Sequence, residues 1–152
     1  MKISKIFFVL IVSLVFNISA QAQTKNVWRT LGMIKFEKSH SQSDGVTHQK
    51  PRVEPMIQAM DGDEMIVKGY VIPLSGKIGQ SHFMFSAYPY ANCFFCGKAG
   101  AESVMEVFTK DEQKVAYSEE PIYMKGIFKY LGYKPNDLMF ELKDAVQVEA
   151  PE

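Results

Sequence analysis

Apolar and polar residues alternate along the second half of the chain, and this alternation predicts β-strands. In the stretch PIYMKGIFKYL, Ile122, Met124 and Phe128 fall on one face and the intervening residues fall on the other. Similar patterns recur in neighbouring segments, and turn-forming Gly, Pro, Asn and Asp residues separate them. The sequence therefore predicts five strands, at residues 64–74, 81–88, 102–108, 121–131 and 138–149.

Two glycines inside these strands indicate how the sheet is arranged. Gly69 and Gly126 sit in the middle of strand patterns, where a missing side chain weakens packing unless the strand must bend. Short, bent strands are what a small coiled barrel requires. The predicted fold class is mainly β, a small five-stranded OB-like antiparallel barrel. The alternative is an open antiparallel sheet packed on a short helix.

One short helix is predicted before the first strand. Met56, Ile57 and Met60 follow Pro55 at the spacing of a helical turn, and Gly62 ends the pattern. This helix opens the OB-like β domain, which is expected to cover residues 54–152.

A polar extension of residues 23–53 is predicted to precede this domain. It shows little periodicity, and its Ser, Asp, Gly and Pro content predicts a loop over residues 39–51. The apolar residues available to anchor the extension are Trp28, Leu31, Met33, Ile34 and Phe36.

The first residues have the organisation of a secretory signal peptide. Lys2 and Lys5 precede an apolar run over residues 6–16, and the stretch Ala20-Gln21-Ala22 follows. Since the run is shorter than the roughly 20 residues that span a bilayer, a membrane anchor is the weaker interpretation. We expect residues 1–22 to be removed and the mature protein to be periplasmic or secreted, with no stable membrane insertion.

Charge argues against a nucleic-acid partner. Removing residues 1–22 takes away two lysines and no acids, so 17 basic and 17 acidic residues become 15 and 17, a net charge of −2. A phosphate-binding domain usually carries a cationic excess. The chain also lacks G-x-S-x-G, H-E-x-x-H and glycine-rich phosphate motifs, so we expect no enzyme other than one based on thiols.

The only two cysteines, Cys93 and Cys96, form a C-x-x-C pair in the stretch SAYPYANCFFCGKAGAES. Two thiolates at this spacing are half of a site for zinc or a copper ion. His82 is the first candidate for a further ligand, although a solvated strand residue is its plainer interpretation. The other side chains available to complete a metal site are Glu102, His40 and His48.

The same pair has two other interpretations. A periplasmic thiol-disulfide protein would need a cysteine with a lowered thiol pKa. The charge of Lys98 would help to lower it, but no helix is predicted after Cys96 to lower it further. A structural role, as a loop disulfide or as two inert thiols, is the third reading. Gly97 stands where a c-type haem site requires His, so that site is excluded.

Four aromatic residues surround the cysteines: Tyr88, Tyr90, Phe94 and Phe95. Aromatics beside the binding face of an OB-like barrel commonly stack on ligands, and an oligosaccharide, a peptide or a partner protein suits the charge of this chain. The alternative is that Phe94 and Phe95 cap the barrel and Tyr90 covers its rim.

Four stretches, in their order along the chain, resemble a family of small exported bacterial proteins of unknown function. They are MIQAMDGDEMIVKGYVIPL, FMFSAYPYANCFFC, PIYMKGIFKY and LMFELKDAVQVE, and together they run from about Val53 to Glu149. The resemblance implies an OB-like barrel and export, and it implies no activity. From the residues we expect an exported, non-enzymatic binding module whose partner is a metal ion or a periplasmic protein.

Overall fold

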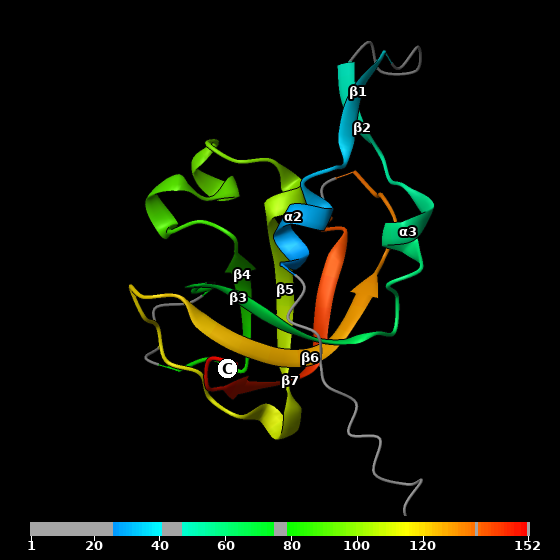
Figure 1. Ribbon diagram of the computed structural model, residues 1–152. Helices are drawn as coiled ribbons and strands as arrows, with labels where there is room; N and C mark the ends of the chain where they lie inside the picture. Colours follow the sequence, from blue (N-terminus) through cyan, green and yellow to red (C-terminus); the bar gives the residue numbers. More distant parts are fainter. Residues whose placement is uncertain (1–25, 41–46, 75–78, 136, 152) are drawn as a thin grey trace, which may run out of the picture.

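A computed structural model describes residues 26–40, 47–74, 79–135 and 137–151 (Figure 1). The predicted signal peptide, residues 1–22, lies outside these ranges. Within them, no helix has both the length and the apolar character needed to cross a membrane.

The described residues are mainly β-structure. The helices are α2 (Val27–Leu31) and α3 (Pro55–Gln58), and a hairpin is formed by β1 (Lys35–His40) and β2 (Thr47–Arg52). The barrel strands are β3 (Glu64–Ile72), β4 (His82–Ser86), β5 (Val104–Thr109), β6 (Ile122–Tyr130) and β7 (Phe140–Val148). Short 3-10 turns occur at Tyr90–Asn92, Phe94–Cys96, Ala101–Ser103 and Lys110–Glu112. All five predicted strands are confirmed.

The five strands close into a barrel in the order β3-β4-β5-β7-β6. The predicted barrel is confirmed. The open sheet is wrong because β3 and β6, the first and last strands of this order, also pair with each other. One pairing departs from the antiparallel expectation: β5 and β7 are parallel, with Glu106 opposite Glu141. The reason is parity, since strands that alternate in direction around a ring can all be antiparallel only when their number is even.

Both glycines lie where the strands change partner or register. β3 pairs with β6 as far as Gly69 and with β4 from Tyr70 onward. The β6–β7 register shifts around Gly126, where an added Cβ would lie 2.7 Å from the carbonyl oxygen of Lys143. At these two points the barrel therefore needs backbone without a side chain.

The barrel core is aromatic. Phe83, Phe85, Phe128 and Phe140 are fully buried and lie within one continuous apolar cluster. Residues of the N-terminal extension join the same cluster, namely Val27, Leu31 and Ile34. Trp28 also ties α2 to the barrel, because its indole Nε1 donates a hydrogen bond to the carbonyl oxygen of Lys68 at 2.7 Å.

The loop predicted over residues 39–51 is wrong in part, and so is the single helix. Residues 35–40 and 47–52 pair as an antiparallel hairpin that extends from the barrel, and α2 is a second short helix (Figure 1). The hairpin is rich in Lys, Glu, His and Gln, so it has no apolar face to produce a strand pattern. Its backbone hydrogen bonds are satisfied between its two strands instead.

Candidate functional site

The connection between β4 and β5, residues 87–103, carries both cysteines and is called the cysteine loop below. Its base is closed by a hydrogen bond from the backbone N–H of Ala87 to the carbonyl oxygen of Ser103, at 2.9 Å. The hydroxyl of Ser103 in turn donates to the carbonyl oxygen of Gly100 at 2.6 Å, and the hydroxyl of Ser86 accepts from the N–H of Tyr88 at 3.1 Å. The loop is thus fixed at both ends to rigid strands.

A 3-10 turn brings the two cysteines together. The backbone N–H of Cys96 donates to the carbonyl oxygen of Cys93 at 3.1 Å, and Gly97 ends the turn with a φ of 70°. Both thiols are free. Cys93 is buried and Cys96 is exposed, and the thiol of Cys96 donates to the carbonyl oxygen of Tyr90 at 3.1 Å.

The electrostatic surroundings favour the protonated form of Cys96. Desolvation of the sulfur and a hydrogen bond with Cys93 raise the pKa of Cys96, and the nearby charge of Lys98 lowers it only in part. A raised pKa leaves little thiolate at neutral pH, and the thiolate is the nucleophile and the metal ligand. These surroundings therefore favour the thiol over the thiolate at Cys96.

His82 lies at the opposite end of β4 from the cysteine loop, since β4 begins at His82 and the loop begins after Ser86 (Figure 1). The structure does not bring it to the cysteines. Its ring stacks on Phe108, and its Nε2 lies 3.4 Å from Oε1 of Glu106.

The other metal-ligand candidates do not complete a site either. Glu102 folds its carboxylate over Gly100, and its Oε2 is buried with no hydrogen-bond partner among the described residues. The side chains of His40 and His48 lie outside the described part of the structure. Over the described residues, no group of three or more His, Cys, Asp or Glu side chains is arranged to hold a metal ion.

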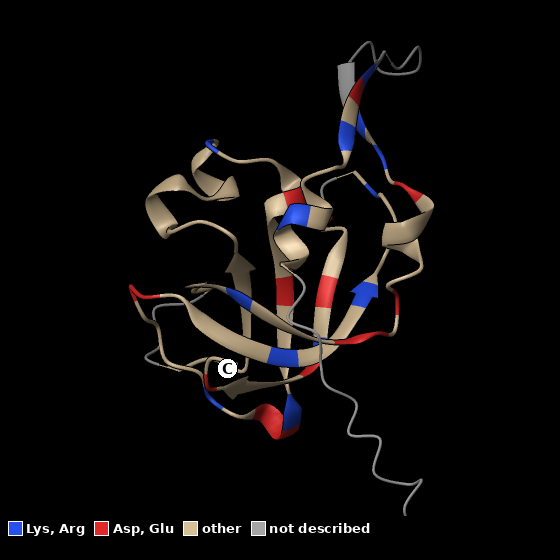
Figure 2. Cartoon of the chain, in the orientation of Figure 1, with Lys and Arg blue, Asp and Glu red and all other residues tan. Residues whose placement is uncertain are grey.

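Three of the four predicted aromatics are open to solvent. The exposed fractions of Tyr88, Tyr90 and Phe95 are 49%, 57% and 51%. Phe94 is half-buried and packs edge to face against Phe95, with ring centroids 5.4 Å apart. Figure 2 shows that the cysteine loop carries little charge, and its charged residues are Lys98 and Glu102. The loop thus presents a weakly charged, aromatic end of the molecule.

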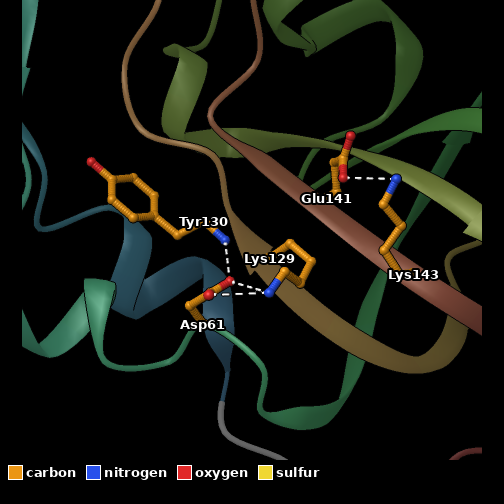
Figure 3. Close-up of polar contacts among 5 residues, drawn as sticks. All are labelled: Asp61, Lys129, Tyr130, Glu141 and Lys143. Atoms are coloured by element: carbon orange, nitrogen blue, oxygen red, sulfur yellow. Dashed lines mark hydrogen bonds and ion pairs between the residues drawn. The ribbon is translucent and has the colours of Figure 1, made fainter.

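A second cluster, which sequence reasoning missed, covers the outer face of β4, β5 and β7. The ring of Phe108 is stacked against His82, and Nζ of Lys143 lies 3.8 Å from its centroid. Lys143 also pairs with Glu141 at 2.9 Å (Figure 3). The alternation of β5 and β7 was a usable signal, since it places alternate residues of each strand on the outer face.

Comparison with protein-family models and with curated proteins finds no match to this chain. Among solved structures, the chain is similar to a DUF3299 family protein from Pseudomonas aeruginosa PAO1, whose crystal structure was determined at 2.45 Å resolution. The TM-score is 0.44 and the sequence identity is 20%, over 67% of this chain and 70% of that one.

Proposed function

We propose that this protein is an exported, non-enzymatic binding module that contacts a partner protein through the cysteine loop. The observation that carries the proposal is the exposure of Tyr88, Tyr90 and Phe95 on a loop that is fixed at its base. Large aromatics are the residue type that most often dominates protein interfaces, and a rigid loop loses little entropy on binding. Export rests on the signal-peptide pattern of residues 1–22.

The cysteines have a structural part in this proposal. Cys93 and Cys96 stand three residues apart on one 3-10 turn, and in an oxidising compartment they form a disulfide across it. Each thiol gives up its proton, and the pair transfers two electrons to a disulfide-bearing oxidant, which is reduced to two thiols. The new bond holds the turn that positions Phe94 and Phe95.

A second candidate function is the binding of a soft metal ion, copper or zinc, by the same two cysteines. It is favoured by the placement of both cysteines on one 3-10 turn, since soft ions such as Cu(I) select thiolate ligands. Binding must release protons from thiols, and the raised pKa of Cys96 makes that release harder. Zinc would in addition need further ligands to reach its usual four.

The thiol state and metal content of protein isolated from the periplasmic or secreted fraction separate these candidates. A loop disulfide gives an intact mass lower by two hydrogens, no free thiol and no bound metal. Copper or zinc that is lost on Cys93→Ser or Cys96→Ser supports the second candidate. A mixed disulfide with another protein, trapped when one cysteine is replaced, would contradict both and indicate a thiol-disulfide protein.

Contact with a partner is tested separately by placing a photo-crosslinking amino acid at position 95 in cells. The control carries the same amino acid at position 56, because Met56 on α3 is similarly exposed. Binding is then measured with the purified partner. The double variant Tyr88→Ala/Phe95→Ala should weaken it by about tenfold or more, whereas Met56→Ala should not. Equal crosslinking at both positions, or binding that survives the double variant, would overturn the role of the loop.

A further inference from the structure

Two hollows lined by aromatic residues lie along the outer face of β3, and together they are called the groove below. The volumes of the two hollows are about 350 and 260 Å³. The first lies between α2, β3 and the start of β6, and Trp28, Lys68 and Tyr123 line it. The second lies between β3, the start of the cysteine loop and the segment that precedes β6, with Tyr90 and Tyr117 in its wall. Five aromatic residues therefore line the two hollows, and Tyr70 belongs to both.

The groove is built on rigid elements. Alternation along β3 turns Ile66, Lys68 and Tyr70 outward, and Lys68 lies opposite Tyr123 in the β3–β6 register. The Lys68 ammonium stands 5.5 Å from the centroid of the Tyr123 ring. Because the indole of Trp28 donates to the carbonyl oxygen of Lys68, its ring is held beside the same residue. Such preformed surfaces bind with a smaller entropic cost.

Lys68 brings an ammonium group to the groove, and the other polar side chains that line it are the tyrosine hydroxyls, Asn26, Ser118 and Glu119. Within the described part of the chain, the Lys68 ammonium and the tyrosine hydroxyls along the groove have no hydrogen-bond or ion-pair partner; these tyrosines are Tyr70, Tyr90, Tyr117 and Tyr123. Glu119 is the only carboxylate that lines either hollow among the described residues. A ligand with carbonyl acceptors, an acidic group for Lys68 and flat apolar faces fits this surface.

A proline-rich segment has this chemistry. Proline has no backbone N–H, so the chain offers carbonyl acceptors without matching donors. In the polyproline II conformation these carbonyls are free of internal hydrogen bonds, and the conformation is already populated before binding. Grooves lined by aromatic residues are a recurring way of binding such segments. A neutral oligosaccharide fits less well, because it offers no anionic group to the Lys68 ammonium.

We propose that the groove binds a proline-rich segment of a partner protein in the polyproline II conformation, with an acidic residue of the segment paired to Lys68. This goes beyond the proposed function of the cysteine loop, which borders the groove through Ala87 and residues 89–91 and shares Tyr90 with it. Neither Tyr88, Phe95 nor a thiol lines either hollow. The two sites are therefore separable by mutation.

Trp28 is the single tryptophan of the chain and lines the first hollow, so its fluorescence reports directly on occupancy. The probe is a decaproline peptide that ends in Asp-Asp, added to the mature full-length protein. A Gly-Ser peptide of equal length with the same ending, and a neutral linear oligosaccharide, serve as the other arms. We expect a saturable change in Trp28 emission with the proline peptide alone, and amide chemical-shift changes confined to the lining of the groove.

Substitutions in the groove test whether the proline peptide binds there. Tyr70→Ala and Tyr123→Ala should each weaken it by about tenfold or more, and the matched control Tyr133→Ala, whose ring lines a different hollow, should leave it unchanged. Tyr70→Phe and Tyr123→Phe keep the rings, so a loss of several-fold in these folded variants measures the hydroxyl donors. Lys68→Gln should weaken the Asp-Asp peptide at low salt and leave an uncharged decaproline unaffected.

The proposal is overturned if the proline peptide produces no saturable change, or if the Gly-Ser peptide binds as well. It is equally overturned if only the oligosaccharide binds, or if Tyr133→Ala reduces binding as much as Tyr70→Ala. Tyr88→Ala/Phe95→Ala should not affect the proline peptide. Failure here therefore leaves the proposed function of the cysteine loop standing, and the converse also holds.

Discussion

The imidazole of His82 lies flat against the ring of Phe108, with centroids 4.3 Å apart and planes inclined by 11°. The two residues face each other in the β4–β5 register, on the outer face of the barrel. Lys143 approaches the same ring from β7, the strand on the other side of β5. His82 thus belongs to a surface cluster that joins three strands, at the end of β4 far from the cysteines.

This placement predicts that His82→Ala leaves cysteine chemistry intact. The thiol state, and any copper or zinc uptake by Cys93 and Cys96, should match that of the unmodified protein. Stability should fall by about 0.5–1.5 kcal/mol, the usual value of an aromatic pair, as measured by urea unfolding. A double-mutant cycle with Phe108→Ala should return a coupling energy of similar size. Metal uptake that depends on His82 would contradict this assignment.

Local patterns were sufficient to predict the barrel strands but not the complete topology. Ile122, Met124 and Phe128 alternate because one face of β6 is buried, and this alternation is a local property. The parallel pairing of β5 with β7 depends on closure of the barrel, and the residue pattern of a single strand does not indicate closure. The β1–β2 hairpin was missed because its residues are polar on both faces, so its pairing left no periodic signal.

The site was predictable to a similar degree. Cys93 and Cys96, spaced C-x-x-C, lie on one 3-10 turn, with Cys93 buried and Cys96 exposed. The alternation of β4 predicted His82 on the outer face of the barrel, but it did not show that His82 lies at the end of β4 far from the cysteine loop. The groove was missed because it joins Trp28 from the N-terminal extension to Tyr70 and Tyr123, residues brought together only by the tertiary fold.

Gly126→Val should strongly destabilise the barrel. The added side chain would meet the Lys143 carbonyl oxygen at 2.7 Å and Cγ of Leu142 at 2.9 Å, and the backbone of β7 cannot move away without losing its pairing. We expect a loss of about 1–3 kcal/mol or more in urea unfolding. Gly79→Ala is the matched control, because its nearest neighbour is the exposed Lys114 side chain at 3.1 Å. Equal losses would argue against the bend.

Leu31→Ala should show that the N-terminal extension folds together with the barrel. Leu31 is fully buried in the same cluster as Phe83 and Phe85, so its truncation should cost about 2–5 kcal/mol. Met33→Ala, at a position that is 46% exposed, should change little. Unfolding followed by Trp28 fluorescence and by circular dichroism should give one coincident transition. Two separate transitions would show that α2 is not part of the cooperative unit.

Asp61 should contribute stability that depends on pH. Its carboxylate accepts hydrogen bonds from Nζ of Lys129 and from the backbone N–H of Tyr130, and it forms an ion pair with Lys129 at 2.9 Å (Figure 3). These contacts lower the pKa of Asp61 below its ordinary value of 3.8. As the pH falls, the carboxylate of Asp61 is therefore protonated at a higher pH in the unfolded chain than in the folded chain. The contribution is fully present above the ordinary value and is lost as pH falls through the folded value.

Asp61→Asn should accordingly lower the urea midpoint at neutral pH by a small amount, since the site is exposed. The difference from the unmodified protein should shrink as the pH is lowered below 3.8. Asp137→Asn is a control, because Asp137 is exposed and takes part in no ion pair between described residues. A pH-independent difference at Asp61 would show that the contacts do not depend on its charge.

Thiol alkylation of the reduced protein tests the surroundings of the cysteine pair. Cys93 is buried, so iodoacetamide should modify Cys96 alone in the native protein and both cysteines after unfolding. The pKa of Cys96 is raised by desolvation and by its hydrogen bond with Cys93, so its modification should be slow at neutral pH and should accelerate into the alkaline range. Cys93→Ser replaces the neighbouring thiol and should shift the rate profile of Cys96 to lower pH. Peptide mass mapping at a series of pH values measures each rate. Rapid labelling of Cys96 at neutral pH, with no change on Cys93→Ser, would show that its thiol is activated and would favour the thiol-disulfide interpretation over a structural pair.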